Sequence, residues 1–258
     1  MHSRSLRILG LFAALSLVSA CASTKTAPVK SADNYFKDGE AAYASRNFEE
    51  AINQFKKAKE SYSSPELTAK AELKIADAHF DNGAFIEAAA AYEDFRKLHP
   101  TNEKAPYALY RLALANYKQI TGIDTDQTPV KNAVHYLEQF LAQYPGSELV
   151  PEAKTKLADC RAKELAYENY VGDFYLRTGN YGAAIKRLNE ALQRFPGEAG
   201  LDVTLSDLAR AYDKTGDEAH AAKARKRLAA EYPEKLGAQQ GEKPKDGELP
   251  MIIFKDAQ

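Results

Sequence analysis

Residues 179–191 have the sequence GNYGAAIKRLNEA, and the same arrangement recurs four more times along the chain. The other copies are RNFEEAINQFKKA at 46–58, GAFIEAAAAYEDF at 83–95, PVKNAVHYLEQF at 129–140 and GDEAHAAKARKRL at 216–228. Each copy has a turn-prone start, an alanine, and apolar or aromatic residues four and seven places after that alanine. Such spacings lie on one face of an α-helix. The chain therefore contains five amphipathic helical segments, with aligned alanines at Ala51, Ala88, Ala133, Ala184 and Ala221.

A second helical pattern precedes each of these segments, and two features indicate that the two helices pair. Four copies end in an aromatic residue or histidine followed by proline, which cannot continue a helix. These pairs are His99-Pro100, Tyr144-Pro145, Phe195-Pro196 and Tyr232-Pro233. A small residue stands twelve places before the aligned alanine in four copies, namely Gly39, Ala76, Gly172 and Ala209. Small residues there let two helices approach closely, so the pattern predicts helical hairpins.

This pattern resembles the tetratricopeptide repeat, a helix-turn-helix of about 34 residues. We therefore expect an all-α fold, a right-handed superhelical array of five tetratricopeptide-like hairpins over residues 32–236. The third copy has an insertion, ITGIDTDQTPVKN at 120–132, whose composition predicts a loop. No helix breaker stands between Pro151 and Gly172, so the first helix of the fourth repeat is predicted to be long.

The first twenty residues have the three-part layout of an export signal. A short basic start precedes eleven apolar residues at 8–18, about half of the roughly 20 that a membrane-spanning helix needs. The following sequence, LVSAC at 17–21, resembles a bacterial lipobox, which implies that Cys21 is acylated and that the chain is cut just before it. The alternative is an ordinary signal peptide with a cysteine there by chance.

Lipidation would make residues 21–31 a flexible tether between a membrane and the first repeat. Several acyl chains hold a protein to a membrane stably, whereas one chain holds it only marginally. By resemblance to sorted lipoproteins, Ala22 in place of an aspartate favours the outer membrane. At the other end, residues 237–258 form a polar tail whose composition is typical of disorder. The tail contains one short apolar run, MIIF at 251–254.

Charge and cysteine content exclude some classes of protein. After removal of residues 1–20 the chain has 33 basic and 36 acidic residues, a net charge of about −3. A nucleic-acid partner would need a concentrated basic face, so none is expected. Cys160 has no remaining partner for a disulfide, and its helical surroundings predict a small buried apolar residue.

Converging catalytic groups are missing from the sequence. It contains no GxSxG, HExxH or GxxxxGK[ST] motif, and its five histidines lack metal-ligand spacing. We therefore expect no enzymatic activity, no metal and no cofactor other than the covalent lipid on Cys21. A lipid-anchored hydrolase with an unrecognised site is the alternative of a different class.

A stack of helical hairpins has a concave face, lined by its first helices, that can hold peptides or other domains. In the first three repeats, two positions seven residues apart project to one side of the first helix. They are Phe36, Tyr43, Leu73, Phe80, Tyr110 and Tyr117. We predict that these six residues form a groove for an extended apolar peptide. The alternative is that the rings pack between neighbouring repeats.

The whole sequence resembles the BamD family of outer-membrane assembly lipoproteins. The resemblance rests on the lipobox, the five repeats, the insertion in the third repeat and the long segment at 144–196. That segment combines YPxS, LA with Tyr and Glu, FY, and then Gly-x-Tyr-x-x-Ala-x-x-Arg. The resemblance implies a non-enzymatic protein on the periplasmic face of the outer membrane, held there by lipid.

The resemblance also implies partners. The amino-terminal repeats, 32–146, are expected to receive unfolded outer-membrane barrel proteins through a terminal signal that often ends in an aromatic residue. The carboxy-terminal repeats, 147–236, are expected to dock on the POTRA region of the barrel insertase BamA and on other lipoproteins of the complex. The arginine of the Gly-x-Tyr-x-x-Ala-x-x-Arg motif is Arg187 here, a candidate ion-pair partner for an acidic residue of the insertase.

Other periplasmic repeat scaffolds stay open as alternatives. One is a pilotin-like lipoprotein of a pilus or secretin apparatus, and another is a coordinator of cell-wall synthesis with envelope constriction. Their partners would differ, since they would bind a secretin or a cell-wall synthase in place of a barrel insertase.

Overall fold

The computed structural model describes residues 30–61 and 64–234. Within these residues the chain forms ten α-helices and no β-strand. In chain order they are α2 (Ala32–Ala44), α3 (Phe48–Glu60), α4 (Pro65–Asp81), α5 (Phe85–Leu98), α6 (Ala105–Lys118), α7 (Thr128–Gln143), α8 (Val150–Arg177), α9 (Tyr181–Arg194), α10 (Leu201–Thr215) and α11 (Glu218–Glu231). The predicted signal peptide, Cys21, nearly all of the tether and the tail at 237–258 lie outside the described residues.

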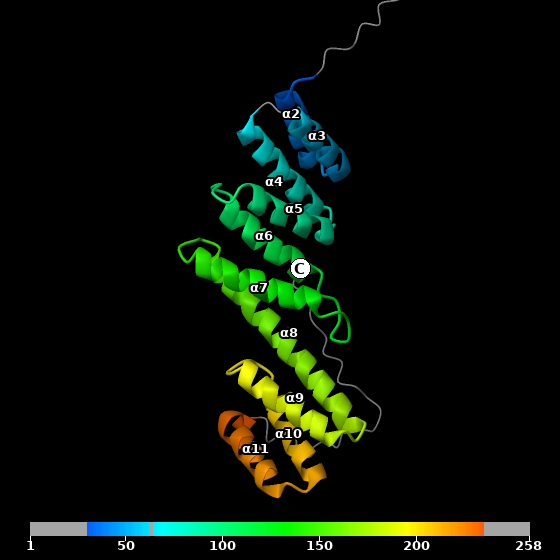
Figure 1. Ribbon diagram of the computed structural model, residues 1–258, viewed down its shortest axis with the longest axis vertical. Coiled ribbons are helices and arrows are strands. Elements are labelled where there is room, and N and C mark those ends of the chain that lie inside the picture. The colour runs from blue at the N-terminus through cyan, green and yellow to red at the C-terminus, as the bar shows by residue number, and fades with distance from the viewer. Residues whose placement is uncertain (1–29, 62–63, 235–258) are drawn as a thin grey trace, which may run out of the picture.

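Consecutive helices pair into five hairpins: α2–α3, α4–α5, α6–α7, α8–α9 and α10–α11. Each hairpin packs against the next, and Figure 1 shows them following one another along the long axis of an elongated molecule. The buried side chains form several clusters along this axis, most of them shared by neighbouring helices. The prediction of an all-α array of five tetratricopeptide-like hairpins is confirmed.

The second helices end where the sequence predicts. His99, Tyr144, Phe195 and Tyr232, each followed by proline, are the carboxy-terminal cap residues of α5, α7, α9 and α11. Their φ angles lie between −134° and −122° and their ψ angles between 54° and 57°. Steric contact with the proline ring disfavours the α conformation at the preceding residue. These residue pairs therefore set the length of the second helices.

Close contact inside the hairpins depends on the small residues of the first helices. A Cβ atom placed on Gly39 would lie 2.6 Å from the Phe55 ring of α3, and one on Gly172 would lie 2.6 Å from Leu188 Cδ2 of α9. Phe55 and Leu188 are completely buried. The predicted role of the small residues is therefore confirmed at both glycines.

Both departures from a plain repeat array are present, but the loop is shorter than predicted. Residues 119–127 form the loop between α6 and α7, which Thr125 closes by donating a hydrogen bond to the Gly122 carbonyl at 2.7 Å, whereas residues 128–132 belong to α7, which Pro129 can begin because its missing N–H is not needed in the first turn. Helix α8 has 28 residues, a length of about 42 Å at the usual helical rise. It packs against α7, α9 and α10, so it links the first three hairpins to the last two (Figure 1).

Cys160 lies on α8 and is fully buried in the cluster between α6, α7 and α8. Burial raises the pKa of its thiol to about 12, so it stays protonated at neutral pH and acts as a small apolar residue, as predicted. Among the described residues, no helix is both long enough and apolar enough to span a membrane.

Candidate protein-binding surface

Helices α2, α4 and α6 carry the six predicted groove residues, two on each helix. Four of their rings contact a ring of the second helix in the same hairpin. The centroid separations are 5.3 Å for Phe36 and Phe55, 5.4 Å for Tyr43 and Phe48, 5.2 Å for Phe80 and Phe85, and 5.5 Å for Tyr110 and Phe140. Leu73 and Tyr117 also pack against buried clusters. The predicted groove residues are thus also part of the packing between helices.

Tyr110 differs from the other five residues in its exposure. It is only 3% exposed, whereas the others are half-buried and keep an accessible edge. The start of α8 covers it, since Ala153 and Leu157 belong to the same buried cluster. The prediction that Tyr110 lines a groove therefore needs correction, because its ring is a core element. For the other five residues the groove stays a prediction.

A network of polar side chains, which the sequence analysis missed, joins the first three repeats. We call it the Asp77–Arg111 network, and its members are Tyr43, Asp77, Asp81, Tyr92, Tyr107 and Arg111. At its centre the carboxylate of Asp77, which is 8% exposed, accepts hydrogen bonds from Tyr92 Oη at 2.6 Å and from Tyr107 Oη at 2.9 Å. A buried carboxylate needs such partners, and here they come from α5 and α6.

Arg111 connects this centre to the predicted groove. Its Nε donates a hydrogen bond to Tyr92 Oη at 2.9 Å, and its Nη2 lies 3.1 Å from Asp81 Oδ1. Its guanidinium carbon lies 3.7 Å from the centre of the Phe80 ring, a stacking contact that suits the planar group. Asp81 also accepts a hydrogen bond from Tyr43. Two of the predicted groove residues are therefore held in place by this network.

The surroundings of the three phenols keep them protonated. Burial, followed by the charge of Asp77, raises the pKa of Tyr92 and of Tyr107 above the ordinary value. Burial and the hydrogen bond to Asp81 raise the pKa of Tyr43 in the same way. The protonated phenol is the form that donates each of these hydrogen bonds, so the raised pKa values extend to alkaline pH the range in which the network is intact.

One signal in the sequence could have found this network. Asp77 directly follows Ala76, one of the small residues at which the two helices of a hairpin are predicted to approach closely. A carboxylate at such a position indicates a buried partner. Tyr107 and Arg111 are four residues apart on α6, so they lie on one helical face toward it.

Arg187, the predicted docking residue, already has a partner inside the chain. It forms an ion pair with Glu168 of α8, and its guanidinium lies 5.7 Å from the centre of the Tyr167 ring. The Glu168 side chain is only 12% exposed and also accepts a hydrogen bond from Arg194 Nη1 at 3.0 Å. Arg187 keeps 32% of its side chain exposed. One edge of this arginine is therefore accessible to another protein.

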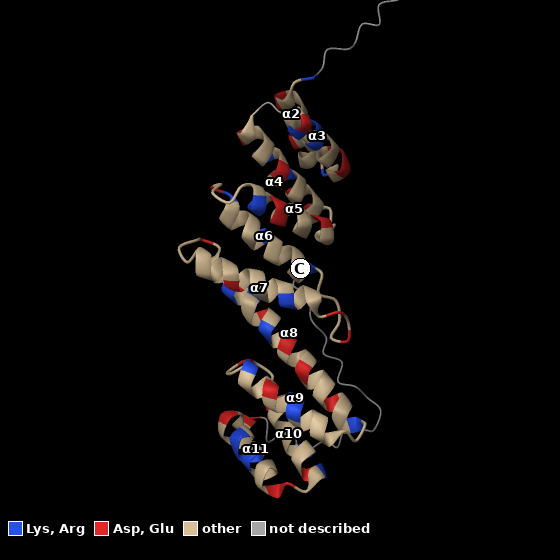
Figure 2. Cartoon of the chain, in the orientation of Figure 1, with Lys and Arg blue, Asp and Glu red and all other residues tan. Residues whose placement is uncertain are grey.

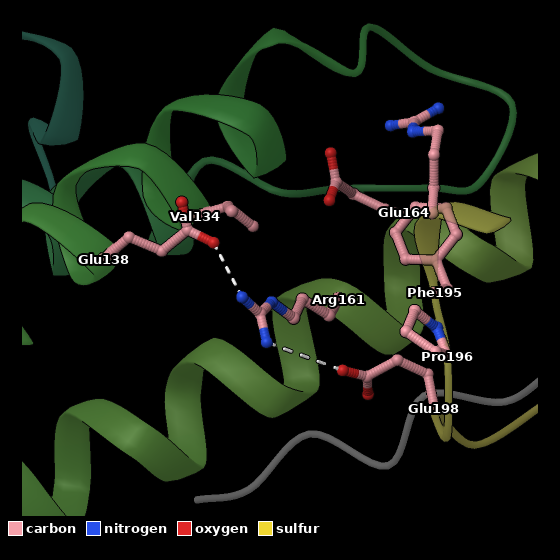
Figure 3. Close-up of a pocket in the computed structure, with 8 residues that line it drawn as sticks. Val134, Glu138, Arg161, Glu164, Phe195, Pro196 and Glu198 are labelled. Carbon is pink, nitrogen blue, oxygen red and sulfur yellow. Dashed lines mark hydrogen bonds and ion pairs between the residues drawn. The ribbon is translucent and has the colours of Figure 1, made fainter.

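A charged pocket of about 330 Å³ lies where α7, α8 and the α9–α10 connection meet. We call it the junction pocket. Figure 3 shows Arg161 at its centre, with Nη2 at 2.8 Å from Glu138 Oε1 and Nη1 at 3.9 Å from Glu198 Oε1. Burial raises the pKa of Glu164, which also lines the pocket. Phe195 and Pro196 form its apolar wall.

The surface charges of the array are mixed in sign. Figure 2 shows basic and acidic residues interspersed along α8, α9 and α11, with no broad area of one sign on the visible face. Many form ion pairs one helical turn apart, such as Arg177 with Asp173 at 2.8 Å. Among the described residues, no group of three or more His, Cys, Asp or Glu side chains could hold a metal ion.

Comparison with protein families gives one match that covers most of the chain. The sequence model of a family named YfiO, described as outer membrane lipoprotein, matches residues 28–228. This range begins just before α2 and ends within α11, so it includes nearly the whole array.

Curated relatives and solved structures are similar at lower levels. The chain is 26% identical to the outer membrane protein assembly factor BamD of Caulobacter vibrioides over 166 residues, which cover 64% of this chain and 54% of the relative. It is 26% identical to the protein of the same name from Vibrio cholerae over 214 residues, which cover 79% of this chain and 89% of the relative. Among solved structures, the TPR2AB domain of yeast Sti1, in its complex with pHSP90, has a TM-score of 0.41 at 20% identity and 78% coverage of both chains.

The Asp77–Arg111 network predicts a large loss of stability when its centre is removed. In the variant Asp77→Ala the hydroxyls of Tyr92 and Tyr107 lose their buried acceptor, so we expect the free energy of unfolding to fall by about 2–4 kcal/mol. Asp94→Ala, at an exposed position of α5, is the matched control. It is expected to change the free energy of unfolding by less than about 0.5 kcal/mol. Urea unfolding followed by circular dichroism measures both, and equal stabilities would contradict a structural role for the network.

Proposed function

We propose that this chain, which belongs to the YfiO family of outer membrane lipoproteins, is a non-catalytic scaffold for the assembly of outer-membrane β-barrel proteins. The observation that carries the proposal is the family match over residues 28–228, which includes nearly all of the hairpin array. The two relatives named above are outer membrane protein assembly factors, which supports the same role. A stack of hairpins supplies extended surfaces for partners and requires no catalytic group.

In this role the amino-terminal repeats, 32–146, bind unfolded barrel proteins by a terminal segment that ends in an aromatic residue. Five side chains support the proposal, because each keeps an accessible edge: Phe36, Tyr43, Leu73, Phe80 and Tyr117. The Asp77–Arg111 network supports it further, since rings that are already held in place lose little conformational entropy when a peptide binds.

The carboxy-terminal repeats, 147–236, dock on the POTRA region of the insertase BamA and on other lipoproteins of the complex. The accessible edge of Arg187 supports this part of the proposal. Glu168, which also pairs with Arg194, holds Arg187 in place, so the accessible edge of Arg187 alone would contact an acidic residue of the insertase.

Lipid on Cys21 holds the scaffold at the periplasmic face of the outer membrane. Eight residues separate Cys21 from Lys30, where the described structure begins shortly before α2. The nine residue steps from Cys21 to Lys30 span at most about 32 Å when fully extended. The first hairpin, which carries Phe36 and Tyr43 of the proposed peptide groove, is therefore the part of the array that is held nearest to the membrane.

Lipid anchoring predicts a change of location in the variant Cys21→Ala. Without the thiol there is no site for acylation, so the chain is expected in the soluble periplasmic fraction or cut at another position. Fractionation followed by a carbonate wash measures the membrane-bound share, with the unchanged chain as the control. A Cys21→Ala chain that still resists the wash would show that something other than lipid holds it.

Docking on the insertase predicts which proteins the full chain recovers. With the chain as bait in a gentle detergent, we expect mass spectrometry to identify a β-barrel insertase. Recovery of a secretin or a cell-wall synthase without an insertase would contradict the proposed function.

Within that interaction, Arg187→Gln is expected to weaken binding to the purified POTRA region about tenfold, because one charge-assisted contact is lost. Arg194→Gln is the matched control, since it also removes a partner of Glu168. Its binding should stay within about twofold of the unchanged chain. If Arg187→Gln binds as the unchanged chain does at both low and high salt, Arg187 is not in the interface.

Substrate binding by the first three repeats predicts a loss of peptide affinity when an accessible ring is removed. Tyr43→Leu or Tyr117→Leu is expected to weaken binding of a peptide ending in phenylalanine by about tenfold or more, as for other aromatic anchors in interfaces. Tyr170→Leu, on α8 outside these repeats, is the control and should have no effect. Titration calorimetry with the full chain measures all three, and equal affinities would contradict the predicted groove.

A further inference from the structure

A second hollow lies on the other side of α7 from the junction pocket. It has a volume of about 230 Å³, and α5, α6 and α7 form its walls. We call it the α5–α7 groove, and its apolar lining consists of Ile86, Ala89, Ala90, Leu112 and Tyr136. Ile86 is 71% exposed, more than any other large apolar side chain among the described residues. The groove therefore presents apolar surface to solvent.

The polar side chains of this groove are already hydrogen-bonded within the chain. The side-chain amide of Asn116 donates to the Leu112 carbonyl at 2.9 Å and accepts from Asn132 Nδ2 at 3.2 Å. Gln119 Nε2 donates to the Phe85 carbonyl at 3.3 Å and to the Ala115 carbonyl at 3.0 Å. The part of the groove that has no partner within the chain is its apolar surface. The groove therefore suits an apolar occupant.

The chain itself contains a segment of that chemistry outside the described residues. Residues 251–254, MIIF, are four consecutive large apolar residues in an otherwise polar tail. The segment and the groove are therefore complementary in apolar character.

The point at which the described chain ends favours this segment over a separate partner. Tyr232, two residues before that end, packs in the cluster that contains Phe195. Phe195 lines the junction pocket together with Val134 of α7. Tyr136, two residues after Val134 on α7, lines the α5–α7 groove. Side chains two positions apart on a helix point to nearly opposite sides, so the pocket and the groove lie on opposite sides of α7. The route from the end of the described chain to the groove therefore crosses the junction pocket and the width of α7.

The tail is long enough for that route. Residues 235–250 are sixteen residues, which span at most about 55 Å when extended, whereas the width of one helix is about 10–12 Å. Residues 235–250 contain three lysines and three acidic residues. The junction pocket on the route is lined by three glutamates and two arginines, so both carry charges of both signs (Figure 3).

We propose that the MIIF segment of the chain's own tail packs into the α5–α7 groove, with the preceding residues crossing the junction pocket. The tail then covers the most exposed apolar side chain of the array. It also links the last hairpin to the second and third hairpins across the long helix α8. This proposal is independent of the proposed function, because it concerns contacts within one chain.

A tryptophan in the tail tests the packing directly, since the chain contains no tryptophan. In the full chain with Phe254→Trp, the emission maximum is expected at shorter wavelength than that of hydrated indole. Adding Ile86→Asp should move the emission to that of hydrated indole. Adding Leu98→Asp should leave it unchanged, because Leu98 is 63% exposed on the same helix but does not line the groove. Emission of hydrated indole in Phe254→Trp alone, or equal shifts with both aspartates, would overturn the proposal.

Crosslinking separates the chain's own tail from that of a second copy. With Ile86→Cys and Ile253→Cys together, a bismaleimide is expected to give at least about tenfold more intramolecular product than with Leu98→Cys and Ile253→Cys, because a tethered segment is present at high effective concentration. Cys160 is buried and does not compete, and Ile86→Cys alone measures any background from Cys21. The yield should not depend on protein concentration. Equal yields for the two pairs, or only crosslinked dimers, would overturn the proposal.

Discussion

The array depends on close contact between the two helices of each hairpin. Gly39 and Gly172 leave no room for a Cβ atom, because Phe55 and Leu188 fill the space directly above them. Two helices packed at this short distance form a wide apolar face. The hairpin buries that face by packing against the next hairpin. The elongated shape follows from this, since each of the three inner hairpins has one neighbour on each side and the stack grows in one direction (Figure 1).

The same packing decides which side chains are available to partners. An aromatic residue on a first helix packs against the second helix of its own hairpin, so part of its ring is already buried in the absence of a peptide. The Asp77–Arg111 network then fixes two rings of first helices, Tyr43 and Tyr107, through hydrogen bonds to Asp81 and Asp77. The accessible surface of the first three repeats is therefore preorganised, which favours binding because little conformational entropy is lost.

Helix α8 gives the molecule its two halves. It is the first helix of the fourth hairpin, yet its beginning packs against the third hairpin, where it covers Tyr110 and buries its own Cys160. Its later part carries Glu168, which holds Arg187 and Arg194. Because one continuous helix carries both sets of contacts, the orientation of the last two hairpins relative to the first three is set by its packing at both ends. The junction pocket lies between these two sets.

The sequence by itself determined the helices, their pairing and their ends. A helical repeat is a local pattern, and an aromatic residue before proline or a glycine opposite a large side chain acts within one hairpin. Only the tertiary structure decided that Tyr110 is covered by α8, that Asp77 meets two phenols from α5 and α6, and that Arg187 is paired with Glu168. Each of these contacts joins different helices, and two of them join different hairpins. Periodicity along one helix places a side chain on a face, but which groups lie opposite that face is set by how the hairpins stack.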